Sequence, residues 1–102
     1  MINVTARFAI KPDHNAQFES AVAAAREVFL ADPGCLRFDL QRVAKEDGSY
    51  VLLEAYDSKD ALGRHGKMPE FAAFSTQIAE LAVTQPEITV LLPVGEQTSL
   101  TS

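Results

Sequence analysis

Apolar and polar residues alternate strictly at the start of the chain. The apolar residues at every second position are Ile2, Val4, Ala6, Phe8 and Ile10. Side chains of a β-strand point to opposite faces in turn, so this period of two predicts a strand over residues 2–10.

The following segment changes to helical spacing. Its apolar positions are Phe18, Ala21, Val22, Ala25, Val28 and Phe29. This spacing predicts a helix that is capped by Asp13 and runs to about Ala31. The sequence Asp32-Pro33-Gly34 is typical of a helix end.

The middle of the chain predicts a β-hairpin. In its first strand, Leu36, Phe38 and Leu40 alternate with Arg37, Asp39 and Gln41. The polar turn over residues 45–49 leads into a second strand over residues 50–57. A short polar turn between two strands favours their antiparallel pairing.

The last third predicts two helices and a final strand. Ser58 suits the N-cap of a short helix ending at Gly66, and Pro69 suits the first turn of a second helix. The apolar face of that second helix consists of Phe71, Phe74, Ile78 and Leu81. Residues 87–94 predict a strand, and the polar residues 96–102 predict a flexible tail.

These elements give the order β-α-β-β-α-β, with the second crossover split into two helices. The order predicts a ferredoxin-like α+β domain over residues 1–95, with an antiparallel sheet and its helices on one face. The strand at residues 50–57 is apolar on both faces, with Tyr50 and Leu52 on one and Val51 and Leu53 on the other. We therefore expect a second copy of the chain to cover the face without helices, although singly exposed apolar residues are the alternative.

Composition narrows the possible partners and compartment. The 102 residues carry a net charge of −5, and the basic residues are scattered, so we expect no nucleic-acid or membrane partner. The N-terminus does not resemble a signal peptide, and no stretch approaches the roughly 20 apolar residues of a membrane span. A single cysteine, Cys35, fits a reducing compartment, so we expect a cytoplasmic protein.

Several common catalytic and binding motifs are missing from the sequence. With two histidines and one cysteine, the chain has no zinc-site pattern of ordinary spacing, and we expect no metal. No glycine-rich loop follows a strand, so a nucleotide-phosphate cradle is not expected either. An enzyme built on this chain is expected to hold no tightly bound cofactor.

His65 is the candidate for proton transfer. It follows Ala61 by one turn and lies on the same helical face, so its ring is expected to point toward the sheet. Imidazole has an ordinary pKa of about 6.5, which suits a general base near neutral pH. The structural alternative is a core histidine that bonds a backbone carbonyl or closes the helix end, and the residues alone favour it.

Four further side chains are candidates for binding a small molecule. Glu54 and Tyr56 share one face of their strand, and Arg37 and Asp39 share one face of the neighbouring strand. Buried polar groups are costly unless they are satisfied, so groups on a buried face either bond one another or line a pocket. For Arg37 and Asp39, a structural ion pair or a dimer contact is the favoured alternative. Cys35 has no activating neighbour in the sequence and is expected to fill space.

Three segments together resemble the antibiotic biosynthesis monooxygenase family. They are Pro33-Gly34-Cys35-Leu36-Arg37-Phe38-Asp39, then Leu53-Glu54-Ala55-Tyr56-Asp57-Ser58-Lys59-Asp60-Ala61, and then His65 with Pro69 and Phe71. The resemblance extends over almost all of residues 1–95. It is nearest to the branch of quinol monooxygenases and of the isomerase that acts on phosphorylated autoinducer-2.

The resemblance implies a dimeric α+β barrel that oxidises a quinol or a polyphenolic, polyketide-like small molecule with O₂ and without metal or flavin. His65 would handle the proton, and Glu54 and Tyr56 would line the pocket. A deprotonated, electron-rich phenol reduces O₂ itself, so the protein needs to supply a base, a dry site and orientation.

The chain departs from two patterns found within the family. Haem-degrading members carry asparagine, tryptophan and histidine where this chain has Ala6, Tyr56 and Ser75, which disfavours haem degradation. The family often has Ser/Thr-Pro-His where this chain reads Met68-Pro69-Glu70, so a second pocket histidine is missing.

Two other functions stay open at the level of sequence. One is isomerisation of a small keto compound, which for a phosphorylated substrate would need a cation such as Arg37, Arg64 or Lys67 beside the pocket. The other is a dimeric module that binds an aromatic ligand without turnover.

Overall fold

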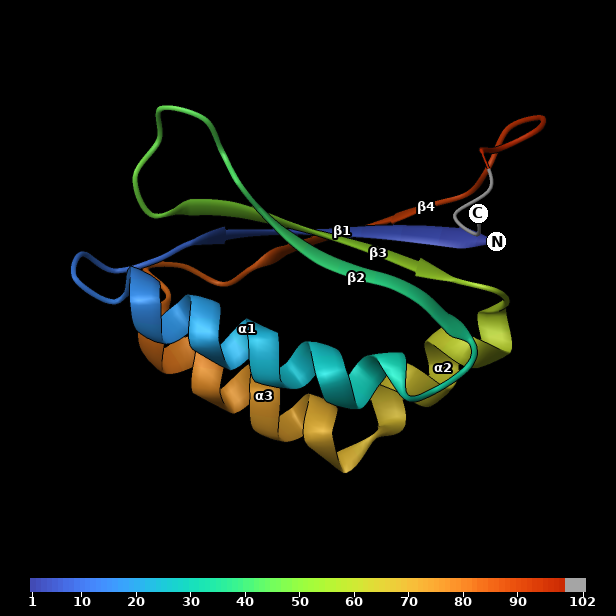
Figure 1. The fold of residues 1–102 in the computed structure, drawn as a ribbon, viewed down its shortest axis with the longest axis horizontal. Coiled ribbons are helices and arrows are strands. Elements are labelled where there is room, and N and C mark those ends of the chain that lie inside the picture. Colours follow the sequence, from blue (N-terminus) through green and yellow to red (C-terminus); the bar gives the residue numbers. More distant parts are fainter. Residues whose placement is uncertain (99–102) are drawn as a thin grey trace.

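The computed structural model describes residues 1–98 and contains four strands and three helices (Figure 1). In chain order they are β1 (Ile2–Ala9), α1 (Asn15–Leu30), β2 (Cys35–Arg42), β3 (Ser49–Tyr56), α2 (Lys59–Lys67), α3 (Pro69–Leu81) and β4 (Glu87–Leu91). None of the helices within the described residues is long and apolar enough to span a membrane.

The strands form one antiparallel sheet in the order β2-β3-β1-β4. All three helices lie on the same side of this sheet, and within residues 1–98 no helix covers its other side (Figure 1). This is the ferredoxin-like α+β arrangement with a split second crossover, so the predicted fold is confirmed.

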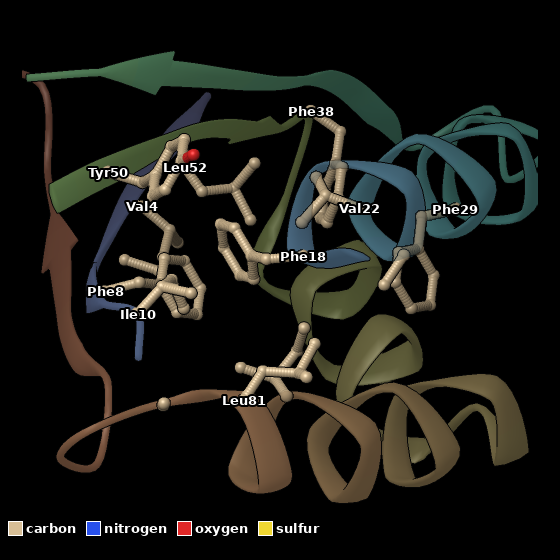
Figure 2. Packing of buried hydrophobic residues seen from close by; sticks show 14 of the residues in the cluster. Val4, Phe8, Ile10, Phe18, Val22, Phe29, Phe38, Tyr50, Leu52 and Leu81 are labelled. Carbon is tan, nitrogen blue, oxygen red and sulfur yellow. The ribbon is translucent and has the colours of Figure 1, made fainter. Parts of the chain in front are cut away.

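The core lies between the sheet and the helices. Phe18 of α1 is fully buried, and its ring centroid lies 5.1 Å from that of Phe8 and 4.8 Å from that of Tyr50. Figure 2 shows the Phe18 ring among the apolar side chains of the sheet, with Leu81 of α3 approaching from the other helix. The predicted apolar positions of β1, with Ile10 just beyond it, are all buried in this layer.

Of the two helix N-caps predicted from the sequence, one is confirmed and one is wrong. Ser58 caps α2 as predicted, since its Oγ accepts a hydrogen bond from the Ala61 amide at 3.1 Å. The prediction that Asp13 caps α1 is wrong. His14 occupies the N-cap position, and Asp13 lies in the turn before it with a positive φ of 68°.

The strand boundaries also correct two expectations. A β-bulge between Cys35 and Arg37 interrupts the alternation of β2, so Leu36 is 39% exposed instead of joining Phe38 in the core. The last strand ends at Leu91, short of the predicted residue 94. The predicted tail begins with residues 96–98, which form no helix or strand, and its remaining residues, 99–102, lie outside the described residues.

Candidate active site

A cavity of about 520 Å³ lies between the sheet and α3. Its wall is mostly apolar, and the larger apolar side chains are Phe8, Phe38, Leu52, Phe71, Phe74 and Ile78. Its polar side chains are Glu54, His65, Ser75, Thr84 and Gln85. A largely apolar pocket with a few convergent polar groups is typical of a small-molecule site.

The cavity exists because the helices leave part of the sheet uncovered. Ile88 and Val90 of β4 lie on the same face as the buried Ala6 and Val4, yet they are 62% and 54% exposed. β4 is an edge strand, and α1 packs over the opposite half of the sheet, against β2. Ile88 therefore forms part of the cavity wall instead of the core.

His65 lies in the cavity wall on the inner face of α2, as its helical position predicts. Its side chain is 8% exposed and packed among aromatic rings, with centroids at 4.4 Å for Phe29 and 5.1 Å for Phe71. Among the described residues no hydrogen bond joins the ring to a backbone carbonyl, whereas the other structural alternative, a histidine that closes the helix end, fits the place of His65 in the last turn of α2. Its Nδ1 is buried and has no hydrogen-bond partner among the described residues.

The close approach of β2 to α2 holds His65 in place. A Cβ atom on Gly34 would lie 2.5 Å from the Ala61 Cβ, so only glycine permits this approach. Arg64 donates two hydrogen bonds to Asp32, at 3.1 and 3.0 Å, which ties the same helix to the start of the hairpin.

Glu54 faces His65 from the sheet. Its side chain is 8% exposed and lines the cavity, and its Oε1 lies 3.8 Å from His65 Nε2. This separation is longer than a hydrogen bond, so the two groups do not satisfy each other. A ligand hydroxyl between them would be within reach of both.

Burial shifts both groups toward their neutral forms. Loss of hydration raises the pKa of Glu54, and the hydrogen bond that it accepts from Tyr56 partly offsets this. Burial likewise lowers the pKa of His65, and the negative charge of Asp32 opposes that effect. Carboxyl and imidazole groups shifted in this way are suited to proton transfer near neutral pH.

Tyr56 does not line the cavity, although the sequence suggested that it would. Its side chain is fully buried behind Glu54, and its hydroxyl donates a hydrogen bond to Glu54 Oε1 at 2.5 Å. Glu54 and Tyr56 share one face of β3 as predicted, and the structure shows that it is the face covered by the helices. Only the packing of the neighbouring strands decides which of the two reaches the cavity.

Arg37 and Asp39 lie on the opposite face of the sheet and do not line the cavity. They form an ion pair at 3.1 Å, and Arg26 of α1 reaches the same carboxylate at 3.1 Å. The alternation of β2 separates them from the site, because their neighbour Phe38 is the residue that points inward. The structure therefore brings together Glu54, Tyr56 and His65, but not Arg37 and Asp39.

Sequence reasoning missed one side of the cavity, which consists of Ser75, Ala79 and residues 82–86. These residues carried no chemical signal, and the segment after α3 was treated only as a boundary. The one available clue was the apolar face of residues 87–94, which has more apolar positions than two helices can cover. Cys35 is buried, and burial raises the pKa of its thiol, which agrees with a space-filling role.

A sequence profile of the family described as antibiotic biosynthesis monooxygenase (ABM) matches residues 1–77. The chain belongs to the antibiotic biosynthesis monooxygenase family. The resemblance found in the sequence is thus confirmed.

Relatives within the ABM family carry different names. Rv0793 of Mycobacterium tuberculosis, provisionally named a monooxygenase, is 33% identical over 95 residues, which are 93% of each chain. An isomerase of Klebsiella pneumoniae that acts on (4S)-4-hydroxy-5-phosphonooxypentane-2,3-dione is 31% identical over 77 residues, which are 76% of this chain and 78% of that protein.

Solved ABM structures share the fold closely. The structure of Rv0793 has a TM-score of 0.87 at 32% identity and covers 95% of this chain and 98% of that one. An ABM-family structure from Caulobacter crescentus has a TM-score of 0.86 at 34% identity, covering 91% of this chain and 89% of that one.

Proposed function

We propose that the chain is a cofactor-independent monooxygenase that oxidises an uncharged quinol or polyphenol with O₂. The observation that carries this proposal is the Glu54–His65 pair at the wall of an otherwise apolar cavity. The name of the relative Rv0793 supports the reaction class.

The pair takes the phenolic proton of the substrate. Its members are too far apart to form a hydrogen bond with each other, so both are open to the substrate hydroxyl. The phenolate then reduces O₂, and the two recombine to a peroxide at a ring carbon. Loss of water leaves one oxygen atom on the ring, so a hydroquinone and O₂ give a hydroxyquinone and H₂O. The substrate supplies all four electrons, and no further reductant is needed.

The charge of the cavity supports a neutral substrate. Within residues 1–98, no lysine or arginine lines it, and its ionisable side chains are Glu54 and His65. Arg64 is paired with Asp32, Arg37 lies on the far face of the sheet, and Lys67 is exposed outside the cavity. A phosphate group buried beside Glu54 would lack a counter-charge, which is costly.

The second candidate is proton transfer without O₂, as in an isomerase of a small keto compound. The Klebsiella relative favours it, since its name assigns this type of reaction. The same pair would remove a proton and return it to a neighbouring carbon. The cavity charge argues for an unphosphorylated substrate in that case also.

The proposal includes a second copy of the chain on the helix-free face. Val51 and Leu53 of β3 are only half-buried there, and Leu91 of β4 is 43% exposed on the same face. Together they offer an apolar surface that a matching surface would remove from water.

Oxygen-electrode measurements with a panel of reduced quinones test the reaction. We expect uptake above the autoxidation rate with neutral hydroquinones and much less with carboxylated or phosphorylated ones. His65→Ala is expected to reduce the rate by about 10²-fold or more, and the matched control His14→Ala to leave it unchanged, because His14 lies outside the cavity.

Four results would overturn parts of this proposal. No uptake with any quinol, or full uptake in His65→Ala, excludes the monooxygenase mechanism. Substrate isomerisation without oxygen consumption establishes the second candidate. An aromatic ligand that is retained in native mass spectra and never turned over identifies a binding module instead.

A further inference from the structure

The hydroxyl of Tyr56 has an unusually restricted environment. The residue is fully buried, and the hydrogen bond from its hydroxyl goes to Glu54 Oε1. The strand partners of Tyr56 are Ile2 and Cys35, and those of Glu54 are Val4 and Phe38. The Cys35 thiol lies beside the same phenol and contributes to its raised pKa, but burial and the Glu54 carboxylate are the larger causes.

The direction of this hydrogen bond is settled by chemistry. Burial raises the pKa of Tyr56 well above its ordinary value, so the phenol keeps its proton and acts as the donor. A charged Glu54 carboxylate has no proton to donate, so its Oε1 accepts this hydrogen bond.

We propose that Tyr56 is a positioning residue for the Glu54–His65 pair: its hydroxyl fixes the Glu54 carboxyl group and favours its charged form beside the cavity. This inference rests on the proposed function of the pair. It also explains why a residue without access to the cavity sits two positions after Glu54 on the same strand face.

Other titratable groups around Glu54 do not replace this role. His65 faces it from α2 at 3.8 Å, and Cys35 of β2 is a buried thiol next to Tyr56. Asp32 acts on His65 through its charge and is held by Arg64. Of these groups, Tyr56 is the one that donates a hydrogen bond to the Glu54 carboxyl group.

A second tyrosine on the same strand provides a matched control. Tyr50 is also buried on the helix side of β3, and its hydroxyl donates to Glu19 at 2.6 Å. Glu19 additionally pairs with Arg42 at 3.4 Å, and neither Tyr50 nor Glu19 lines the main cavity. Tyr50→Phe therefore removes the same chemical group without touching the proposed site.

The decisive measurement is a direct titration of Glu54 by ¹³C NMR on protein labelled at the glutamate carboxyl carbon. We expect Tyr56→Phe to raise the pKa of Glu54, because the variant loses a hydrogen bond that favours the charged form. Tyr50→Phe is expected to leave the titration of Glu54 unchanged. Resonances are assigned with Glu54→Gln.

Kinetics supply the second readout. In Tyr56→Phe we expect kcat to fall about tenfold with little change in KM, and the acid limb of the rate profile to move to higher pH. In the Glu54→Gln background, adding Tyr56→Phe is expected to have no further effect on kcat.

Two outcomes would overturn the inference: an unchanged Glu54 titration in Tyr56→Phe, or a loss of kcat that persists undiminished in the Glu54→Gln background. Because the titration requires no turnover, it separates this inference from the proposed reaction. If no quinol is oxidised but the titration moves, Tyr56 still positions Glu54, and only the reaction assignment fails.

Discussion

The hydroxyl of Tyr56 lies 2.5 Å from Glu54 Oε1, and the same carboxylate oxygen lies 3.8 Å from His65 Nε2. One oxygen atom thus connects a fully buried phenol to an imidazole in the cavity wall. The first contact is a short hydrogen bond, and the second is too long to be one. The hydrogen bond from Tyr56 therefore fixes the Glu54 carboxyl group, and the space between Glu54 and His65 stays open to a ligand.

Glu54→Gln is expected to stabilise the chain at neutral pH. Burial raises the pKa of Glu54 above its ordinary value of 4.5, so the folded state binds this proton more tightly than the unfolded chain does. The wild type therefore loses stability as the pH rises from the ordinary pKa through the folded pKa. The glutamine side chain does not titrate and avoids this loss.

Urea denaturation between about pH 4 and pH 8 measures this effect. The gain in the free energy of unfolding for Glu54→Gln should grow with pH and be smallest at the acid end. Glu27→Gln, at an exposed position of α1, is the control and should show no comparable trend. A gain that is independent of pH would contradict the prediction.

Filling the cavity is expected to prevent substrate binding. Ala79 lies in the cavity wall on an exposed part of α3, so Ala79→Trp places an indole ring in the cavity without disturbing the core. We expect KM for a quinol to rise tenfold or more, as judged from initial rates of oxygen uptake. Ala73→Trp, on the same helix but outside the cavity, should behave like the wild type.

A charge on the helix-free face is expected to separate the two proposed subunits. Leu53 is half-buried on that face, and Leu53→Glu would place an unpaired carboxylate in an apolar interface. Light scattering after size exclusion should give a dimer for the wild type and a monomer for the variant. Ala24→Glu, exposed on α1, is the control. A monomeric wild type would end the dimer proposal.

The elements and their inward faces could be predicted from local patterns. The period of two in β1, the Ser58 cap and the apolar face of α3 depend on residues that are close in sequence, and each was observed. Backbone geometry alone sets these periods, so they are readable without knowledge of the fold. His65 could be placed on the inner face of α2 for the same reason.

Other features required the tertiary structure. The bulge that exposes Leu36 depends on how β2 pairs with β3, and the separation of Arg37 and Asp39 from the site depends on which face the helices cover. From the sequence, Glu54 and Tyr56 were equivalent candidates on one strand face. In the packed structure Glu54 lines the cavity, whereas Tyr56 is fully buried beside it.

The sequence by itself determined the order of elements, the family and the candidate base, because these depend on spacing along the chain and on recognisable residue types. Only the tertiary structure decided where the cavity lies, since a cavity is space that no side chain fills. It arises here because α1 and α3 leave Ile88 of the edge strand uncovered. Residues from four strands and two helices line this cavity, so no local sequence pattern predicts it.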